Sequence, residues 1–473
     1  MKKKTDIAYI ISHGFAARML MQTDLLGKLS QKGFKIAVIT PDKNDKNLVT
    51  YTEGKQIDIY EYNPKSALWT GEYIRLRKYL FEDIRKNPAL WEKHLRDVIN
   101  ARQRKSFSAL FKIRFYYFIY LLVRTFPVLR KLFAGFERKS LKDPDADSLI
   151  DQLQPELLIA TFPVNLSESR LLFAGNKAKG TRTVIHLLSW DNITCKGHFP
   201  QLADYYISWG DIMKEEFMEY YSIPEQKIIN TGVPHFDLHI QVSGSEVYKS
   251  LIQQKGLDPE IPYVFFAMSS PYFAPHEIDI VEWLSKKIET GQFGKMQMII
   301  RPHPQNMGGS MADNTWIQRL KNLQTVTISV DWPKMVESNL NWSMQMGDML
   351  DFAHLIEGCI ISVNSGSTVA IDSLLHNKPV ILTLFDAENK LPWWQSASRI
   401  KDYKHCRKLV DEGGATIVND YDEFLTAING YLSDKNYQQE KRQHARFREV
   451  GVNDGNATGR VVDAIQQIMA NRN

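Results

Sequence analysis

Short apolar runs rich in β-branched residues alternate with stretches of helical periodicity along most of this chain. The run Asp6–Ser12 is followed by Ala17–Gln31, in which leucines recur at helical spacing. Gly33 ends the helical stretch, and a second β-type run covers Lys35–Thr40. A strand–helix–strand order of this kind predicts parallel strands with helices packed on both faces of the sheet.

The same pattern predicts two groups of strands. The first group lies at 6–12, 35–40, 57–62, 156–161, 183–188, 205–208 and 227–230. The second group lies at 263–268, 296–300, 325–330, 359–363, 379–384 and 415–418. We therefore expect an α/β protein with two doubly wound, Rossmann-like domains that face a cleft. Ligands of such sheets bind beyond the carboxyl ends of the strands, so the residues after each strand are candidates for a site.

The limits of the domains follow from these groups and from the length of 473 residues, since a domain commonly holds about 100–200 residues. We expect one domain over 1–240, a second over 258–455, and a terminal helix over 456–473 that packs back on the first domain. The stretch from about 69 to 142 has helical periodicity and is too long for an ordinary crossover. We interpret it as a helical insertion in the first domain.

The insertion also carries the charge of the chain. Lys and Arg number 59 and Asp and Glu 54, so the net charge is +5. Between Ala101 and Lys142, eleven basic residues stand against one acid, Glu137, so this segment carries +10 and the rest −5. Aromatic and aliphatic residues between the cations are typical of a helix on an anionic membrane surface. The alternative is a solvated basic helix packed on the core, and the local confinement of the charge argues against a nucleic-acid partner.

The cysteines and the apolar runs indicate the compartment. Cys195, Cys359 and Cys406 stand far apart with no metal-ligand spacing, so neither a disulfide framework nor a zinc site is expected. The run Ile7–Ile11 is too short for the core of a signal peptide. The longest apolar run, Phe115–Val123, has nine residues, whereas a spanning helix needs about 20. We expect a cytoplasmic protein, peripheral on the inner face of the membrane.

Three strand ends of the second half carry groups that suit a nucleotide phosphate. Arg301 and His303 lie in an Arg-Pro-His-Pro string after one strand, and their donors suit an anion. Another strand is followed by Asn364-Ser-Gly-Ser-Thr368 and a helix, where free backbone N–H groups favour an anion. The candidate donor-binding residues are Ser270, Arg301, His303, Ser365, Gly366, Ser367, Thr368 and Asp372. A capping loop and, for Asp372, a structural role are the alternatives.

Two strand ends of the first half carry candidates for proton transfer and acceptor binding. His13 ends the first strand and could take a proton from an acceptor hydroxyl, and Asp191 is the second candidate base. Ser189, Trp190 and Asn192 surround Asp191, and a polar turn after them is expected to leave this cluster exposed. The candidate acceptor-binding residues are Gly14, Ser189, Trp190, Asn192 and His235.

Other patterns are absent or discounted. Asp143-Pro-Asp-Ala-Asp147 resembles a metal-binding DxD, but it directly precedes a helical pattern, where acids cap helices. Neither GxGxxG after the first strand nor GxxxxGK[ST] occurs, so a dinucleotide fingerprint and a P-loop are both absent. We therefore predict no metal ligands in this chain.

Four motifs together resemble a known family. They are Gly232–Asp237, Arg301–Pro304, Ser365–Thr368 followed by Asp372 and Lys378-Pro-Val380, and Asp454–Arg460. The chain resembles GT-B glycosyltransferases of bacterial surface-polysaccharide synthesis, especially CDP-glycerol glycerophosphotransferases and capsule Kdo-transferase-like enzymes. More distantly it resembles UDP-N-acetylglucosamine 2-epimerases. The first half lacks the Asp/Glu-Asp-Gly general-base motif of sialyltransferase-like members, so His13 and Asp191 both stay candidates.

The resemblance implies a GT-B fold with the nucleotide in the C-terminal half and the acceptor in the N-terminal half. It implies that His303 binds the donor phosphate and that no metal or other cofactor is required. We therefore expect an enzyme that moves a sugar-type group, or glycerol phosphate, from a nucleotide-linked donor to a glycan or lipid-linked acceptor. The alternatives are a nucleotide-sugar 2-epimerase and a non-catalytic membrane-associated binding protein.

Overall fold

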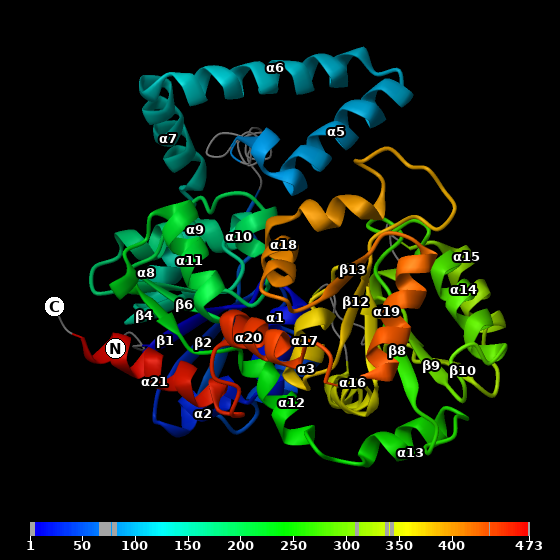
Figure 1. Ribbon diagram of the computed structural model, residues 1–473. Coiled ribbons are helices and arrows are strands. Elements are labelled where there is room, and N and C mark those ends of the chain that lie inside the picture. The colour runs from blue at the N-terminus through cyan, green and yellow to red at the C-terminus, as the bar shows by residue number, and fades with distance from the viewer. Residues whose placement is uncertain are drawn as a thin grey trace. The chain divides into compact units, whose positions relative to one another are not determined.

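The chain forms two compact units of parallel α/β structure (Figure 1). The computed structural model describes residues 5–65, 77, 83–307, 312–335, 340, 345–434 and 436–471. Unit 1 is built from Met1–Pro234, Glu337–Ser343 and Thr458–Asn473, and unit 2 from His235–Val336 and Met344–Ala457. Unit 2 therefore begins at residue 235, whereas the sequence predicts that the second domain begins at residue 258.

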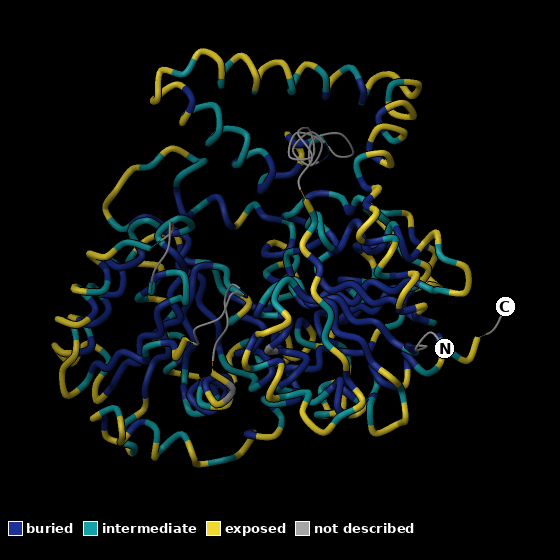
Figure 2. The backbone as a smooth tube through the Cα atoms, turned by 180° about the vertical axis from the view of Figure 1, so that it is seen from behind, coloured by how far each residue is buried: buried dark blue, intermediate teal, exposed yellow. Residues whose placement is uncertain are grey.

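The sheet of unit 1 has seven strands in the order β3-β2-β1-β4-β5-β6-β7, with every neighbouring pair parallel. The strands are β1 (Ile7–Ile10), β2 (Ile36–Thr40), β3 (Ile57–Glu61), β4 (Leu157–Ala160), β5 (Arg182–His186), β6 (Tyr205–Ser208) and β7 (Ile228–Asn230). The central strands are buried on both faces, as Figure 2 shows in dark blue. This is why they stand out as continuous apolar runs in the sequence.

The sheet of unit 2 has six parallel strands in the order β10-β9-β8-β11-β12-β13. They are β8 (Tyr263–Ala267), β9 (Gln297–Arg301), β10 (Ile328–Val330), β11 (Ile361–Asn364), β12 (Val380–Thr383) and β13 (Thr416–Val418). All the strands predicted from the sequence are confirmed in both units. The prediction of two doubly wound α/β domains is confirmed as well.

Helices cover the sheet of unit 1. They are α1 (Gly14–Gln22), α2 (Leu25–Gln31), α3 (Lys46–Thr52), α8 (Pro144–Leu153), α9 (Leu166–Lys177), α10 (Asn192–Cys195), α11 (Asp211–Tyr221) and α21 (Ala457–Ala470). The single helix predicted over Ala17–Gln31 is wrong, because Asp24 adopts φ +52° and separates α1 from α2. The Oδ1 atom of Asp24 accepts a hydrogen bond from Tyr51 at 2.8 Å, which holds this break in place.

Among the described residues, three further helices of unit 1 lie between β3 and α8: α5 (Pro88–Gln103), α6 (Phe107–Thr125) and α7 (Pro127–Leu141). The predicted helical insertion begins at about residue 69, in a stretch that lies largely outside the described residues. Pro88 and Pro127 each occupy the first turn of a helix, where proline costs no hydrogen bond. In Figure 1, α5 and α7 lead to the two ends of α6.

The helices of unit 2 are α12 (Asp237–Val242), α13 (Val247–Gln254), α14 (Glu277–Glu289), α15 (Asn314–Asn322), α16 (Met346–Gly358), α17 (Val369–Leu375), α18 (Lys404–Asp411), α19 (Tyr421–Ser433) and α20 (Gln439–Val450). A core of apolar side chains from β8, β9 and β11 packs against α14 and α19 on one face of the sheet. A second cluster packs α13 and α16 on the other face. Unit 2 is thus a helix–sheet–helix sandwich.

Candidate functional site

Each sheet has a switch point, defined here as the pair of adjacent central strands whose connections leave in opposite directions along the sheet. In unit 1 it lies between β1 and β4, and in unit 2 between β8 and β11. Ligands of open α/β sheets bind beyond the carboxyl ends of the strands at this place. The loops after these four strands are therefore the first candidates for a site.

In unit 2 a buried carboxyl group ties the two switch-point loops together. Glu277 lies in the first turn of α14 and is 1% exposed. Its Oε1 is 2.6 Å from the Oγ of Ser365, after β11, and its Oε2 accepts the N–H of Ser269, after β8, at 2.6 Å. Burial raises the pKa of Glu277 to about 8, against the effect of both hydrogen bonds. The group is therefore protonated at neutral pH.

Three buried polar atoms near this switch point have no hydrogen-bond partner among the described residues. They are the Oγ of Ser270 after β8, the Nδ2 of Asn364 at the end of β11, and the Oδ1 of Asn306 after β9. The Nδ2 of Asn306 donates to the carbonyl of Ser269 at 3.0 Å, which places it beside the β8 loop. An unpaired buried polar group costs about 1–3 kcal/mol. A polar ligand that reached these atoms would relieve this cost.

Arg301 is the last residue of β9 and His303 follows the strand, but they differ in what they can bind. The guanidinium of Arg301 is buried and pairs with Asp331 and, at 2.5 Å, with Asp348, so its fork already holds two carboxylates. His303 is half-buried, and its Nδ1 accepts the N–H of Gln305 at 3.1 Å. Burial lowers the pKa of His303 to about 4. The neutral ring therefore carries its proton on Nε2, which can donate to an anion.

The loop between β11 and α17 is organised by Asn364. Its Oδ1 accepts the N–H groups of Gly366 at 3.0 Å and Ser367 at 2.9 Å, and Gly366 adopts φ +78°. Two backbone donors that we expected to be free are therefore used within the loop. The hydroxyls of Ser367, half-buried, and Thr368, exposed, remain at its surface.

Asp372 has a partner on another helix. Its Oδ1 lies 3.0 Å from the Nε2 of His239 on α12. The Nδ1 of His239 lies 2.8 Å from the Nε2 of His376, and the Nδ1 of His376 lies 2.6 Å from Glu357 on α16. This row of largely buried groups ties α12 to α16 and α17. These contacts favour a structural role for Asp372, the alternative to nucleotide binding.

Unit 1 has an equivalent carboxyl group at its switch point. Glu168, in the first turn of α9, is fully buried. Its Oε1 accepts the hydroxyl of Ser12, after β1, at 2.5 Å, and its Oε2 accepts the N–H groups of Thr161 and Phe162, after β4, at 2.7 and 2.6 Å. Burial raises its pKa to about 7. Sequence reasoning missed Glu168 and Glu277, because an acid in the first turn of a helix is ordinarily taken for a cap.

His13 caps the N-terminus of α1, which begins at Gly14. Its Nδ1 accepts the N–H of Ala16 at 3.2 Å, and its ring packs edge-on against Phe162 with centroids 5.4 Å apart. Burial lowers the pKa of His13 to about 4. The neutral ring carries its proton on Nε2 in this arrangement, so it presents a donor and not a base.

The segment Ser189–Asn192 follows β5. The Oδ1 of Asp191 accepts the hydroxyl of Ser189 at 2.7 Å, and its Oδ2 lies 2.7 Å from the Nζ of Lys196. The expectation of an exposed cluster is wrong for Trp190, 4% exposed, and Asn192, 1% exposed, because α10 packs against α5 and α11. The Nδ1 lone pair of His13 already accepts the N–H of Ala16, whereas Asp191 is a half-buried carboxylate held by Ser189 and Lys196, which favours Asp191 over His13 as a base.

Among the described residues no cluster of His, Cys, Asp and Glu could hold a metal ion. Asp143 caps α8 by accepting the N–H of Asp145 at 3.0 Å, as the sequence predicts. It also pairs with Arg170 at 2.8 Å, so its carboxylate serves the fold. His235 is buried, with its ring centroid 4.2 Å from that of Phe236.

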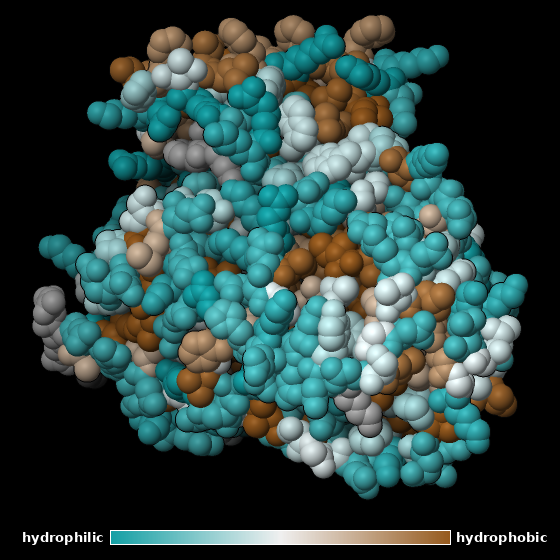
Figure 3. Space-filling model, viewed as in Figure 1, coloured by the Kyte–Doolittle hydropathy of each residue, from teal (hydrophilic) through white to brown (hydrophobic). Residues whose placement is uncertain are grey.

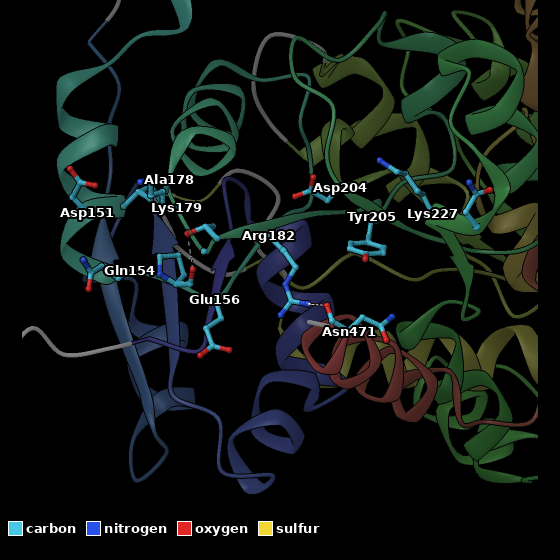
Figure 4. A pocket seen from close by; sticks show the side chains of 15 residues that line it. Asp151, Gln154, Glu156, Ala178, Lys179, Arg182, Asp204, Tyr205, Lys227 and Asn471 are labelled. Carbon is cyan, nitrogen blue, oxygen red and sulfur yellow. Dashed lines mark hydrogen bonds between the residues drawn. The ribbon is translucent and has the colours of Figure 1, made fainter. Parts of the chain in front are cut away.

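A hollow of about 1180 Å³ lies at the other edge of the unit 1 sheet, beside the starts of β4 to β7 (Figure 4). Its lining is mostly polar. Figure 4 shows Arg182 pointing to the end of α21, and its guanidinium donates to the carbonyls of Met469 at 2.9 Å and Asn471 at 2.8 Å. The principal cation of this hollow therefore caps the last helix, which belongs to unit 1.

Comparison with known proteins bears on the fold. No family model matches the chain, and no curated protein matches it. It is similar to a solved structure described as a UDP-N-acetylglucosamine 2-epimerase from Listeria monocytogenes, with 11% identity, a TM-score of 0.57, and coverage of 100% of this chain and 98% of the other. The UDP-GlcNAc 2-epimerase from Neisseria meningitidis bound to UDP-GlcNAc matches with 11% identity, a TM-score of 0.53, and coverage of 98% and 100%.

A glycosyltransferase from Rickettsia africae matches with 13% identity, a TM-score of 0.48, and coverage of 99% and 100%. At these identities the likenesses concern architecture. The chain therefore has a GT-B-like fold of two parallel α/β domains, the architecture that it shares with the two epimerase structures.

Proposed function

We propose that this chain is a metal-independent transferase that moves a sugar-type group, or glycerol phosphate, from a nucleotide-activated donor to a glycan or lipid-linked acceptor. The observation that carries the proposal is the set of three unpaired buried polar atoms at the unit 2 switch point, of Ser270, Asn306 and Asn364. Ser270 and Asn306 lie on the loops after β8 and β9, Asn364 is the last residue of β11, and the half-buried His303 follows β9. Such a set suits a ligand with many acceptor and donor atoms, which describes a nucleotide phosphate.

In this proposal unit 2 holds the donor. The bond between the transferred group and the nucleotide phosphate breaks, and negative charge grows on the leaving phosphate oxygen. The Nε2–H of His303 and the hydroxyls of Ser270, Ser367 and Thr368 stabilise that charge in the transition state. Arg301 acts on the ligand only through the loop that it fixes.

Unit 1 supplies the acceptor side. The acceptor hydroxyl forms the new bond and gives its proton to the carboxylate of Asp191, which Lys196 and Ser189 hold in place. In this proposal the Nε2–H of His13 orients an oxygen of the acceptor. We propose the inner face of the cytoplasmic membrane as the location.

Nucleotide binding and transfer test the proposal. Calorimetry with UDP, CDP, CMP and GDP finds the nucleotide that binds, and a transfer assay with the matching donor follows. S270A should weaken nucleotide binding about tenfold, which is about 1.4 kcal/mol, with little loss of stability, because its hydroxyl has no protein partner to lose. H303A should lower kcat far more than it weakens folding.

The matched control is S285A on α14. Ser285 is also a buried serine of unit 2, but its hydroxyl donates to Val281 within its own helix at 2.9 Å. S285A should leave nucleotide affinity unchanged. If none of the four nucleotides binds, or if S270A and S285A bind alike, the assignment of the unit 2 switch point fails.

A nucleotide-sugar 2-epimerase is the second candidate. Two solved structures described as UDP-GlcNAc 2-epimerases match nearly the whole chain with TM-scores above 0.5. Incubation with UDP-GlcNAc and no acceptor separates the two candidates. An epimer among the products supports the epimerase, whereas an intact nucleotide sugar that is consumed only with an acceptor supports the transferase.

A further inference from the structure

Helix α6 has apolar side chains on two faces. On one face Tyr120 and Val123 are buried in a small cluster with Phe133 of α7 and Leu90 of α5. On the other face the members are exposed, and they recur every three or four residues, which places them in one row along the helix. This exposed row consists of Phe107 (86% exposed), Phe111 (72%), Phe115 (47%), Phe118 (56%) and Leu121 (36%).

The apolar row continues on the next helix. After α6 the exposed large apolar side chains are Phe126, Val128, Leu132 and Phe136. Six of the seven phenylalanines that are exposed among the described residues therefore lie between 107 and 136. Figure 3 shows brown, apolar side chains gathered over α6. We call this set of nine side chains the α6–α7 surface, and water-soluble monomers rarely leave such a set uncovered.

The residues between 101 and 142, which include the α6–α7 surface, carry many exposed cations and no exposed carboxylate. Ten exposed basic residues lie between 101 and 142: Arg102, Arg104, Lys105, Lys112, Arg114, Arg130, Lys131, Arg138, Lys139 and Lys142. The eleventh, Arg124, pairs with Asp83 at 2.6 Å. The acid of the segment, Glu137, is buried and pairs with Arg77. The exposed charge of this surface is therefore positive throughout.

We propose that the α6–α7 surface docks on an anionic membrane, with α6 lying in the plane of the interface. The phenylalanine row would enter the boundary between headgroups and acyl chains, and the lysine and arginine side chains would contact lipid phosphates. Within the part of the chain that the structure describes, no helix has the length and apolarity needed to cross a bilayer. This proposal rests on the α6–α7 surface alone and holds for a transferase or an epimerase.

A second copy of the chain fits this surface less well. Two copies that met through the α6–α7 surface would bring two sets of ten cations together across one symmetric interface. Nucleic acid would satisfy the charge, but aliphatic members such as Val128 and Leu132 gain nothing from base stacking. A lipid surface satisfies both the apolar row and the cations.

Vesicle flotation tests the proposal with the full chain. Wild type should float with vesicles of 30% anionic lipid at low salt, bind neutral vesicles weakly, and lose part of its binding at high salt. The triple variant F107S/F111S/F118S should bind at least about a hundredfold more weakly, since each phenylalanine is worth roughly tenfold in transfer from water. The triple variant K112Q/R114Q/K131Q should lose about fivefold per charge at low salt and less at high salt.

The control variant V247S/V326S/F447S removes three exposed apolar side chains of unit 2. It should bind vesicles as wild type does. Each variant is first checked for a wild-type thermal transition, because the substituted side chains are exposed. Hydrogen exchange should also slow at α6 amides on vesicles.

Four results would overturn the proposal. One is equal binding of wild type to anionic and neutral vesicles, and another is wild-type binding by F107S/F111S/F118S. The third is a wild-type dimer that this variant converts to a monomer without any change in vesicle binding, which would make the surface a contact between copies. The fourth is salt-dependent binding of RNA that persists when vesicles are added as a competitor.

Discussion

Replacement of Glu277 by glutamine tests the protonation state that the structure assigns to the unit 2 switch point. A protonated Glu277 can donate from Oε1 to the hydroxyl of Ser365, whose own proton then goes to the carbonyl of Thr383 at 3.1 Å. Its Oε2 still accepts the N–H of Ser269. A glutamine amide offers a donor and an acceptor in the same places. E277Q therefore copies the protonated side chain and cannot ionise.

The size of the expected effect on the free energy of unfolding follows from the pKa of Glu277, which rises from 4.5 to about 8 on folding. Between these pH values the folded state keeps the proton while the unfolded state releases it. The contribution of Glu277 to stability is therefore complete below pH 4.5 and is lost as the pH rises through 8. The shift of about 3.5 pH units corresponds to about 5 kcal/mol, and the positive end of α14 reduces this by up to about 1 kcal/mol.

The assay is denaturant unfolding of wild type and E277Q at pH 5, 7 and 9. The free energy of unfolding of E277Q, relative to that of wild type, should rise by about 3–4 kcal/mol between pH 5 and pH 9. The reason is that Glu277 of wild type ionises over this range and a glutamine cannot. E289Q, an exposed glutamate at the end of the same helix, is the control and should show no pH-dependent difference. A constant difference between E277Q and wild type across this range would refute the reasoning, since it would mean that Glu277 is ionised throughout.

Three further substitutions probe other contacts. E168Q should show a pH dependence of the same sign but smaller, about 3 kcal/mol at most, because the pKa of Glu168 rises only to about 7; the same unfolding series checks it. R182A should remove the cap of α21 at a cost of about 1.5–3 kcal/mol, seen as faster hydrogen exchange in that helix alone. R301A should destabilise unit 2 by about 3–5 kcal/mol, because it leaves the buried Asp331 and Asp348 without their arginine, and R301K should cost less in the same thermal unfolding assay.

The strands could be predicted because parallel strands buried on both faces appear as apolar runs between turn residues, whatever their partners are. The helix break at Asp24 could not be predicted in this way. Its left-handed backbone is held by the hydroxyl of Tyr51, which lies 27 residues further along the chain. Local periodicity carries no record of such a contact.

The candidate site shows the same division between local and distant information. Sequence reasoning found that polar residues follow β8, β9 and β11, because strand ends are visible in the chain. It did not find what those residues bind. The partners of Arg301 lie 30 and 47 residues away, and Glu277 lies 88 residues from Ser365. An arginine therefore looked free for a phosphate when the fold uses it for two carboxylates.

Each of the two switch-point glutamates links the loops after the two central strands of its sheet, but the two lie on helices that follow different strands. In unit 1, Glu168 lies on the helix after the fourth strand and reaches the first-strand loop at Ser12. In unit 2, Glu277 lies on the helix after the first strand and reaches the fourth-strand loop at Ser365. Both sheets need such a contact because the connections leave a switch point in opposite directions. A buried polar side chain then holds the two diverging loops together.

The protonation of Glu277 bears on whether unit 2 can hold the nucleotide. Burial raises the pKa of both bridging carboxyl groups, to about 7 for Glu168 and to about 8 for Glu277. An ionised carboxylate at Glu277 would repel a phosphate bound to the loops that it ties together. Burial favours the neutral form of Glu277 and so reduces this repulsion. The protonation of Glu277 therefore supports the assignment of the donor nucleotide to unit 2.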